Sequence, residues 1–486
     1  MVKPFFRRHG SEVVMSQPST RTPSRSSLRP REDHSLPQRI ARSAAVTDAG
    51  LLSISGFLSW FAGRGEANRF KVERVRLDGL DGWSFEEPTG NVVHRSGRFF
   101  AVEGLHVSVG PEPRREWHQP IIKQAEVGIL GILVKEFDGV LYCLMQAKME
   151  PGNPNLLQLS PTVQATYSNY TRVHGGSPVR YLDYFVDTSR SRVLADVLQS
   201  EHGAWFYRKS NRNMIVETDE DVPLDENFCW LTFGQIRSLL GFDNLVNMDS
   251  RTVLSCAPAG HPHRSGALHS DLELLSWFTA ERSRHDVRSE RVGLAGLPGW
   301  ASDGGVIERT DGRYFRVVGV SVEASNREVT RWSQPLIEPV AQGVAAFVAQ
   351  RIYGVPHVLV HARVESGFVD TVELAPTVQC VPENYASAEQ RPRFLDLVLS
   401  PDPERVRYSA VHSEEGGRFL NAESRYMIVE TGPDEVPLSP PPGYFWVTAE
   451  QLTSLVRHGH YLNVQARTLL ACLNGMDWHA TDSGAR

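Results

Sequence analysis

The sequence predicts an α+β protein made of two copies of one domain. The first observation is an internal repeat, in which Glu116–Tyr170 aligns without a gap with Arg331–Tyr385. The second is a series of short β-rich runs joined by glycine-containing turns, which favour antiparallel hairpins. The third is a Thr-capped helix pattern near the end of each copy. Hairpins with helices at their ends predict antiparallel or mixed sheets with flanking helices, and not an alternating βαβ fold.

The repeat sets the expected domain boundaries. Its clearest block is LSPTVQ at Leu159–Gln164, which returns as LAPTVQ at Leu374–Gln379. Weaker matches extend the repeat in both directions, so we expect homologous domains at 46–256 and 270–474. Between them, APAGHPHRSGALH at 257–269 has the composition of a linker.

The two ends of the chain are expected to lie outside these domains. Residues 1–45 are rich in Ser, Pro and Arg and should be disordered, because such a segment buries little apolar surface. Residues 475–486 are expected to form a flexible tail.

The first elements of the N-terminal half follow from capping and turn signals. A helix is expected over Leu51–Phe61, with Thr47 as its cap. Strands are expected at Asn91–Arg95 and Arg98–Val102, on either side of the turn Ser96-Gly97.

A stronger hairpin follows in each half. Val127–Phe137 and Val140–Met149 flank Asp138-Gly139, and the second half has strand-like runs at Val344–Ile352 and Val358–Val364.

The closing part of each half is expected to contain further helices and strands. We expect a helix at Ser189–Gln199 and a strand at Met214–Thr218. Thr-capped helices are expected at Thr232–Leu240 and Thr448–Val456.

Composition excludes several classes of protein. With 51 Lys and Arg against 57 Asp and Glu, the net charge is −6, which argues against a surface that binds nucleic acid. No apolar run reaches the length of a membrane span, and no apolar segment follows the charged start, so we expect neither a membrane protein nor a secretory signal. The five cysteines are odd in number and lack a C-x-x-C pair. We therefore expect reduced thiols in the cytoplasm, with Cys143 and Cys229 in the core.

Standard catalytic and cofactor signatures are absent. The chain has no phosphate loop, no G-x-G-x-x-G after a strand, no H-E-x-x-H and no G-x-S-x-G. We expect neither a bound cofactor nor a metal ion.

A polar cluster recurs at equivalent places in the two copies. Strand alternation places Gln146, Lys148 and Glu150 on one face. A solvated edge strand would show the same pattern. However, the second copy repeats a cation and a carboxylate at Arg363 and Glu365, which favours a ligand site. Glycines recur beside both clusters, at 152 and 367, as a turn or a close backbone approach requires.

Aromatic and basic residues surround this cluster. An aromatic ring could stack on a nucleobase, although each one alone is better explained as a core residue or as a tyrosine anchored by its hydroxyl group. Basic side chains in Arg208–Asn213 could hold a diphosphate, or could form a basic hairpin tip. In the second half, Arg418 and Arg425 occupy the corresponding region.

Taken together, these strings resemble the NDP-hexose 2,3-dehydratase family. The resemblance covers about Leu51–Cys472 and rests on Glu116–Pro120, Gln146–Asn153, Gln158–Tyr170, Ser200–Glu217 and Ser413–Phe419. It implies two tandem Nudix-like domains from gene duplication, a homodimer, and a dTDP-linked 4-keto-6-deoxyhexose as substrate. It also implies deoxysugar biosynthesis for antibiotics, with a 3-ketoreductase acting on the product. The R-E-x-x-E-E box that holds magnesium in the wider Nudix superfamily is absent.

The resemblance implies loss of the C-2 hydroxyl of the sugar, with a carbonyl appearing at C-3. This reaction needs a base, an acid and a group that stabilises an enolate. We expect Glu150 or His118 as the base, Lys148 toward the ketone oxygen, and Tyr167 or Tyr170 as the acid. The expected substrate contacts are Trp117, Gln146, Asn153, Gln158, Thr162, Gln164, Tyr167, Asn169, Arg208, Arg212, Arg418 and Arg425. A second, degenerate pocket is expected at Trp332, Arg363, Glu365, Thr377, Gln379 and Tyr385.

Three other functions remain open from the sequence. They are a non-catalytic module that binds a nucleotide sugar, a metal-dependent hydrolase of nucleotide sugars, and an isomerase of dTDP-ketosugars. The missing magnesium box argues against the hydrolase.

Overall fold

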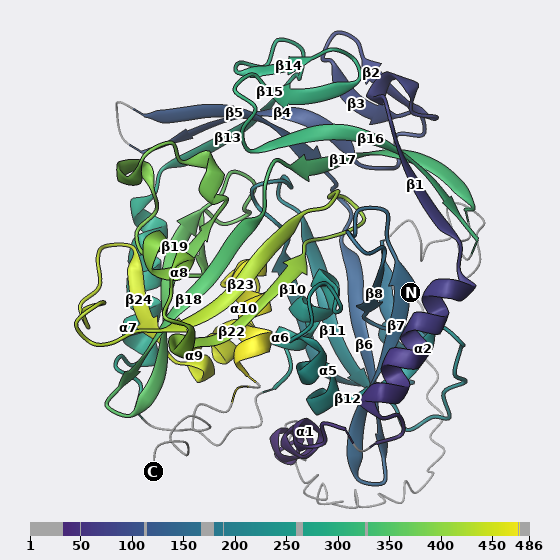
Figure 1. Cartoon of the computed structure of the whole chain (residues 1–486), viewed down its shortest axis with the longest axis vertical. Helices are drawn as coiled ribbons and strands as arrows, with labels where there is room; N and C mark the ends of the chain where they lie inside the picture. Colours follow the sequence, from purple (N-terminus) through teal and green to yellow (C-terminus); the bar gives the residue numbers. More distant parts are fainter. Residues whose placement is uncertain are drawn as a thin grey trace, which may run out of the picture. The chain divides into compact units, whose positions relative to one another are not determined.

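The computed structural model describes residues 33–48, 50–110, 114–166, 179–187, 189–258, 266–325, 329–474 and 476. Leu36–Arg486 form one unit, and everything that follows concerns its described residues (Figure 1). Within them lie two seven-stranded and two five-stranded sheets with flanking helices. The predicted α+β class is confirmed.

The first seven-stranded sheet belongs to the N-terminal half and has the order β10-β11-β6-β7-β12, with β8 paired to β7 and β9 to β6. Its strands are β6 (Gly128–Phe137), β7 (Val140–Met149), β8 (Leu157–Ser160), β9 (Val163–Ala165), β10 (Arg192–Ser200), β11 (Ser210–Glu217) and β12 (Phe228–Thr232). The pair β11–β6 is parallel and the other pairs are antiparallel, so the sheet is mixed. The predicted hairpin at Asp138-Gly139 is confirmed, since both residues have the positive φ that such a turn requires.

The second seven-stranded sheet repeats this arrangement in the C-terminal half. Its order β22-β23-β18-β19 corresponds to β10-β11-β6-β7, with β20 and β24 paired to β19 and β21 paired to β18. Its strands are β18 (Gly343–Ile352), β19 (Val355–Val364), β20 (Val372–Ala375), β21 (Val378–Cys380), β22 (Val406–Ser413), β23 (Glu423–Glu430) and β24 (Tyr444–Val447). Its single parallel pair, β23–β18, corresponds to β11–β6.

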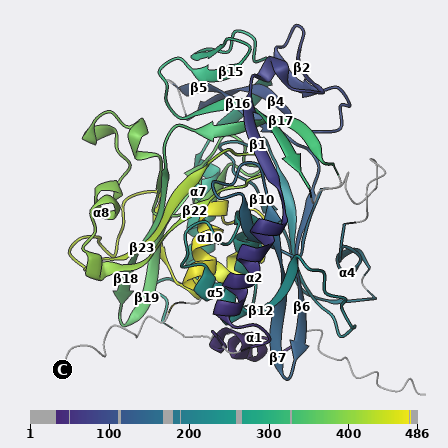
Figure 2. The ribbon, with the colours of Figure 1, turned by 45° about the vertical axis from the view of Figure 1, so that its right-hand side comes forward.

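Two buried helices join the halves. α6 (Met248–Ser255) and α10 (Val464–Leu473) pack against each other and lie between the two large sheets (Figures 1 and 2). Arg251 donates from Nη2 to the Ser413 carbonyl at 2.7 Å, and Arg467 donates from Nη2 to the Ser200 carbonyl at 2.5 Å. Each guanidinium therefore bonds the backbone of the opposite half, and the two contacts are reciprocal.

The five-stranded sheets exchange strands between the halves. β1 (Phe70–Val75) pairs with β16 of the C-terminal half, and β13 (Val287–Val292) pairs with β4 of the N-terminal half. The other strands are β2 (Trp83–Glu86), β3 (Asn91–His94), β4 (Ala101–Val109), β5 (Arg115–Lys123), β14 (Trp300–Ser302), β15 (Val306–Arg309), β16 (Phe315–Ala324) and β17 (Arg331–Pro339). Because each half completes the other's sheet, the halves interleave.

The predicted capping of the closing helices is confirmed. Thr232 caps α5 and Thr448 caps α9, each with a reciprocal capping box. The prediction for the opening helix was wrong in its cap, because Ser53 and not Thr47 accepts from the backbone of α2. The helices are α1 (Leu36–Ala45), α2 (Ile54–Ala67), α4 (Asp183–Val186), α5 (Phe233–Leu239), α7 (Asp271–Arg284), α8 (Leu395–Leu399) and α9 (Ala449–Leu455), with 3₁₀ turns at Leu77–Gly79, Pro382–Asn384, Ala388–Gln390 and Pro403–Arg405.

Two further predictions of local structure are corrected. Residues 36–45, expected to be disordered, form α1, because Leu36 and Ile40 are buried in the core and Ser43 Oγ donates to the Leu141 carbonyl at 2.5 Å. Ser189–Gln199, expected to be a helix, contains most of β10, whose pairing with β11 overrides its local preference.

The hydrophobic cores are formed by side chains of the sheets and of the helices that pack on them. Cys143 and Cys229 are buried in the first core as predicted. Among the described residues, no helix is long and apolar enough to cross a membrane.

Candidate functional site

A cavity of about 930 Å³ lies over the first seven-stranded sheet, within the usual range for a small-molecule site. Strand β7 supplies Gln146 and Lys148 to it, Glu150 follows directly after the strand, and Trp332 and Arg418 come from the other half. The predicted common face of Gln146, Lys148 and Glu150 is confirmed, and β7 is an interior strand and not a solvated edge.

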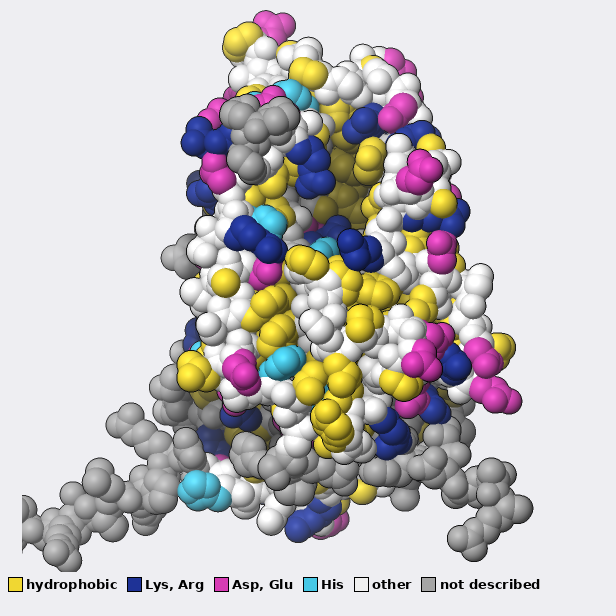
Figure 3. All heavy atoms as spheres, turned by 90° about the vertical axis from the view of Figure 1, so that its left-hand side faces the viewer, with side chains coloured by type: hydrophobic (Ala, Val, Ile, Leu, Met, Phe, Trp, Pro, Cys, Tyr) yellow, Lys and Arg dark blue, Asp and Glu magenta, His cyan; other side chains and the backbone are white. Residues whose placement is uncertain are grey.

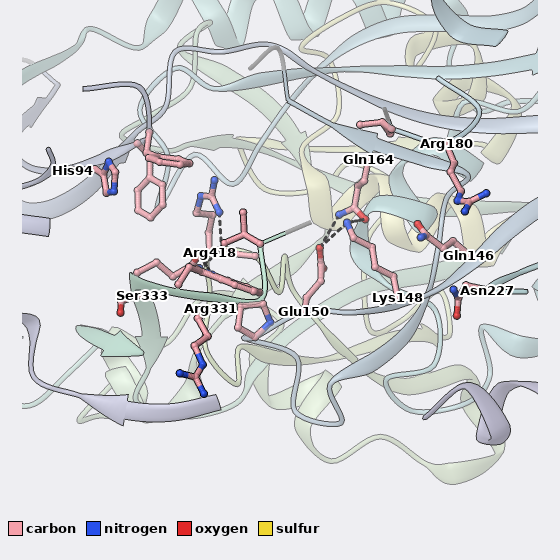
Figure 4. A pocket seen from close by; sticks show the side chains of 18 of the residues that line it. His94, Gln146, Lys148, Glu150, Gln164, Arg180, Asn227, Arg331, Ser333 and Arg418 are labelled. Atoms are coloured by element: carbon pink, nitrogen blue, oxygen red, sulfur yellow. Dashed lines mark hydrogen bonds and ion pairs between the residues drawn. The ribbon is translucent and has the colours of Figure 1, made fainter. Parts of the chain in front are cut away.

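The polar centre of this cavity is a contact between Lys148, Glu150 and Gln164 (Figure 4). Lys148 Nζ lies 3.0 Å from Glu150 Oε1 and donates to Gln164 Oε1 at 2.5 Å. Gln164 Nε2 in turn donates to Glu150 Oε1 at 3.1 Å. An ammonium and an amide therefore converge on one carboxylate oxygen, an arrangement that favours the ionised form of Glu150.

Asp249 lies behind this centre, at the start of α6. It is buried and accepts a hydrogen bond from Gln164 Nε2. Burial, together with nearby carboxylates, raises the pKa of Asp249 well above its usual range. Ser160 Oγ donates to Gln164 Oε1 at 2.6 Å and helps to fix the amide.

A smaller cavity of about 300 Å³ adjoins the first and shares Lys148, Glu150, Gln164 and Arg418 with it. It adds the charged residues Glu126, Glu201, Lys209, Asp249 and Glu415, together with Arg98. Burial lowers the pKa of Lys209 to about 8.

The loop at 414–421 brings the second half into this site. Gly152 N donates to the Gly416 carbonyl at 2.7 Å, and Asn421 N donates to the Gly152 carbonyl at 2.8 Å. A Cβ atom at Gly152 would lie 1.7 Å from the Phe419 carbonyl oxygen, so only glycine fits. The equivalent contact is made by Gly367, where a Cβ atom would lie 1.8 Å from the Phe206 carbonyl oxygen. The predicted close backbone approach at both glycines is confirmed.

Arg418 on this loop lines both cavities, as Lys148 does. Its Nε donates to Gln124 Oε1 at 3.1 Å, and its guanidinium lies 4.2 Å from the centre of the Phe100 ring. The prediction that Arg418 faces the site is consistent with this placement.

Aromatic and cationic residues that the sequence prediction missed line the rest of the larger cavity. They are Trp83, His94, Arg95, Phe99, Arg180 and Arg331. Figure 4 shows Arg331 and Ser333 on the side of Arg418, and Arg180 and Asn227 on the side of Gln146. The strand exchange that places β2 and β17 together cannot be read from a linear repeat, and no motif marks these residues.

Comparison with known proteins now decides the family. The family model described as NDP-hexose 2,3-dehydratase matches residues 54–257 and, a second time, residues 271–473. The chain belongs to the NDP-hexose 2,3-dehydratase family. The two matches correspond to the two copies that the internal repeat predicted.

Three relatives share the family name at high identity. A dTDP-4-dehydro-6-deoxy-alpha-D-glucopyranose 2,3-dehydratase of Amycolatopsis orientalis is 59% identical over 459 residues, covering 93% of this chain and 97% of the relative. Proteins with the same name from Saccharopolyspora spinosa and Streptomyces violaceoruber are each 50% identical, and these matches cover 90% and 87% of this chain and 95% and 98% of the relatives.

In this member of the 2,3-dehydratase family, two predicted site residues lie elsewhere. His118 on β5 stacks on His106 at 4.5 Å and is not among the residues that line either cavity. Trp117 donates from Nε1 to Gln119 Oε1 at 2.9 Å and also lies outside the lining. The expectation that both face the β7 cluster is corrected, because Trp332, the counterpart of Trp117, occupies that place.

The predicted basic contacts are also mostly displaced. Arg212 pairs with Asp196 at 2.5 Å on the surface, and Arg425 Nη1 lies 3.4 Å from Ser409 Oγ. Arg208 places its guanidinium 5.2 Å from the Tyr207 ring. None of the three arginines lines the cavities described above. Arg212 on β11 and Arg425 on β23 instead contact the neighbouring strands β10 and β22.

The remaining predicted residues divide into lining and supporting groups. Thr162 lines the larger cavity and accepts from Leu133 N at 2.8 Å. Gln158 is fully buried and donates to Ser413 Oγ at 2.7 Å, and Asn153 Nδ2 donates to the Leu156 carbonyl at 3.1 Å. Those two lie behind the site and not in it. Tyr167, Asn169 and Tyr170 fall outside the described residues.

The second copy repeats the site with different chemistry. Arg363 Nε lies 2.8 Å from Glu365 Oε1, and Gln379 Nε2 donates to the same oxygen at 3.0 Å. Asn463 Nδ2 donates to Gln379 Oε1 at 2.7 Å. Figure 3 shows a hollow on the side of the second sheet, with hydrophobic side chains inside it and Lys and Arg at its margin.

Three predicted members of this second pocket are placed as follows. Thr377 is buried and accepts from Val348 N at 2.9 Å. Burial raises the pKa of Tyr385, which follows a 3₁₀ turn. Trp332 was grouped with them in error, since it lines the first cavity.

Proposed function

We propose that this chain is a dTDP-4-keto-6-deoxy-D-glucose 2,3-dehydratase, a hydro-lyase that removes the C-2 hydroxyl of its substrate. The observation that carries the proposal is the Lys148–Glu150–Gln164 contact in a cavity large enough for a nucleotide sugar. The family membership and the names of three relatives support the same reaction.

The reaction follows from the substrate's ketone. The carbonyl at C-4 acidifies the hydrogen at C-3, so a base can remove it and leave an enolate with its charge on the C-4 oxygen. Collapse of the enolate expels the C-2 hydroxyl as water after protonation. The resulting enol then tautomerises, which places a carbonyl at C-3 and a second hydrogen at C-2. The product is a 3,4-diketo-2,6-dideoxy sugar.

The β7 residues are suited to the first two steps. Glu150 is the proposed base, because its ion pair with Lys148 and its bond from Gln164 favour the carboxylate. Lys148 is the proposed donor to the C-4 oxygen, where an ammonium stabilises the enolate more than the neutral ketone. His118 is dropped as an alternative base, because it lies outside the cavity lining.

The rest of the larger cavity suits a nucleoside diphosphate. Trp83, Trp332 and Phe99 offer faces on which a thymine could stack. Arg331 and Arg418 supply positive charge for two phosphates. The Arg418 guanidinium lies over the Phe100 ring, and this contact holds the guanidinium within both cavities.

Incubation with dTDP-4-keto-6-deoxyglucose, a 3-ketoreductase and a reduced nicotinamide tests the proposal. A dTDP-2,6-dideoxy-4-ketohexose should form, because the reductase traps the unstable diketone. Return of unchanged substrate would instead favour a module that only binds the nucleotide sugar. A product that retains all its oxygens but differs in configuration would favour an isomerase, and release of dTMP with magnesium would favour a hydrolase.

Several finer expectations are part of the same proposal. The mixed sheet that recurs in both halves, with its helices, supports a tandem Nudix-like arrangement of two duplicated domains at 46–256 and 270–474. We further propose a cytoplasmic homodimer that acts with a 3-ketoreductase in deoxysugar biosynthesis for antibiotics.

A further inference from the structure

We infer that Glu415, contributed by the second half, is the general acid that protonates the C-2 hydroxyl as it leaves the substrate bound at the Lys148–Glu150 centre. This inference rests on the proposed function and deepens it. It gives a role to one further carboxyl group of the site, which comes from a segment far from β7 in the sequence.

The backbone places Glu415 beside Glu150. A Cβ atom built at Gly416 would lie 3.1 Å from Glu150 Cβ, so the chain next to Glu415 touches the proposed base. The hydrogen bond of 2.7 Å from Gly152 N to the Gly416 carbonyl fixes this approach. Glu415 itself lines the smaller cavity together with Lys148 and Glu150.

One oxygen of Glu415 is held and the other is left for a ligand. Oε1 accepts from Gly417 N at 3.0 Å, which fixes the orientation of the carboxyl group. Oε2 is buried and has no hydrogen-bond partner among the described residues. A buried carboxyl oxygen without a partner is costly, and a substrate hydroxyl would satisfy it.

The surroundings of Glu415 suit an acid, whereas those of Glu150 suit a base. Burial raises the pKa of Glu415 to about 7, and this holds despite the opposing charge of Arg418. The charged groups around Glu415 are Arg418, Glu150, Glu201, Lys148, Lys209 and Asp249. Two carboxyl groups whose environments differ in this way are the usual means of running acid and base chemistry in one site.

The second copy differs from the first at the position of Glu415. His202 stands where Glu415 stands in the first site, and its Nε2 lies 2.8 Å from Glu414 Oε2, so that nitrogen is engaged. Ala375 and Gln465 replace Ser160 and Asp249 at the equivalent positions. The second copy does keep a buried carboxyl group, Glu373, but it stands at the position of Gln158 and its Oε2 accepts from Ser200 Oγ at 2.6 Å. The carboxyl group next to the Gly416 approach therefore occurs in the first site and not at its counterpart.

The proton balance of the step is complete without a further reactant. Glu150 takes the C-3 hydrogen as a proton, and the electron pair moves toward the C-4 oxygen. When the bond from C-2 to oxygen breaks, the carboxyl proton of Glu415 passes to the leaving hydroxyl, and water departs. Glu150 then returns its proton to solvent and Glu415 regains one from solvent.

Glu415→Gln tests the assignment, with exchange and elimination measured separately. In D₂O the variant should still exchange the C-3 hydrogen of dTDP-4-keto-6-deoxyglucose, while elimination of water falls by about 100-fold, the usual contribution of a positioned acid. Elimination of fluoride from the 2-fluoro analogue should fall much less, because fluoride leaves without full protonation. Glu150→Gln should lose exchange and elimination together.

The pH profile gives an independent reading. The wild-type kcat/KM should fall as the pH rises through about 7, because Glu415 then loses the proton it must donate. This limb should be missing in Glu415→Gln and kept in Glu415→Asp. Glu404→Gln, on an exposed turn, is the control for both assays.

Three results would overturn the inference. They are a loss under about threefold in Glu415→Gln, equal losses for the two leaving groups, and loss of C-3 exchange in a variant that still binds dTDP. If Glu415→Gln does not fold, equal losses for the two leaving groups in Glu415→Asp would also overturn it. Failure of the wild type to eliminate water from the substrate would refute the proposed function instead.

Discussion

Lys148 Nζ lies 3.0 Å from Glu150 Oε1. Lys148 is on β7, and Glu150 directly follows the strand, two positions further and on the same side. Neighbouring residues on one strand face different sides, so this spacing is the shortest that brings both groups into one cavity. Gln164 from β9 completes the contact by bonding to both. A lysine, a carboxylate and an amide are thus fixed at the point where both cavities meet.

Removal of the ammonium should disable the reaction without unfolding the protein. We expect Lys148→Met to lower kcat by about 100-fold or more, since it removes a charge that stabilises the enolate. Lys135→Met is the matched control, because Lys135 lies on the neighbouring strand, outside the cavity lining, with its Nζ 2.5 Å from the Glu220 carbonyl. Equal activity in the two variants would exclude Lys148 from the chemistry.

The second copy should matter less for catalysis. Arg363→Met replaces the counterpart of Lys148, and we expect it to lower kcat by less than about tenfold, because Glu365 there pairs with an arginine and His202 stands at the position of Glu415. Steady-state kinetics of both variants measure the difference. A larger loss in Arg363→Met than in Lys148→Met would move the active site to the second copy.

Arg418 should contribute mainly to nucleotide binding. Arg418→Ala should raise the Kd for dTDP by about tenfold or more, since a charge-assisted contact to phosphate is worth about 1.5 to 3 kcal/mol. Calorimetric titration with dTDP measures the change. Arg288→Ala, an exposed arginine with 65% of its side chain accessible on β13, should leave the Kd unaltered. An unaltered Kd in Arg418→Ala would place the diphosphate elsewhere.

The contact between the halves should be sensitive to one methyl group. Gly152→Ala places a Cβ 1.7 Å from the Phe419 carbonyl oxygen, and backbone cannot move away cheaply, so we expect a loss of about 3 kcal/mol in the free energy of unfolding. Gly63→Ala, inside α2 with no neighbouring atom within 4 Å, should be neutral or stabilising by about 1 kcal/mol. Denaturant unfolding compares the two, and equal stability would contradict the close approach.

His202 should make stability depend on pH. Burial alone would lower its pKa, but the carboxylates of Glu201, 3.8 Å from Nδ1, and Glu414, 2.8 Å from Nε2, raise it from 6.5 to about 9. A folded pKa above the unfolded one stabilises the protein fully below pH 6.5, and this contribution is lost as the pH rises through about 9. The Tm difference between wild type and His202→Asn should therefore be largest near pH 6 and shrink toward pH 9.5. A difference that stays constant over this range would contradict the ion pair.

Much of the fold could be predicted because its signals are local. The turn at Asp138-Gly139 and the caps at Thr232 and Thr448 depend on neighbouring residues. The internal repeat is found by aligning one segment of the chain with another. Strand β10 could not be predicted from the sequence, because its pairing with β11 decides its structure. Helix α1 was missed because its few apolar residues are enough to anchor it only when the core is present.

The candidate site also contains some residues that could be predicted from the sequence and others that could not. Gln146, Lys148 and Glu150 could be found because strand alternation fixes their common face. Glu415 and Trp332 could not be assigned to that site, because they reach it through contacts between the halves that leave no trace in local spacing. A repeat shows which residues are equivalent, but it does not show which copy's cavity they enter.

The central claim is that the first cavity carries out a 2,3-dehydration. Its most direct test is the mass and deuterium content of the product formed in D₂O from dTDP-4-keto-6-deoxyglucose, with a 3-ketoreductase present. The wild type should give a dTDP-2,6-dideoxy-4-ketohexose with deuterium at C-2 from tautomerisation of the enol, and Lys148→Met should give almost none. Substrate recovered with its C-2 oxygen after prolonged incubation with the wild type would contradict the account.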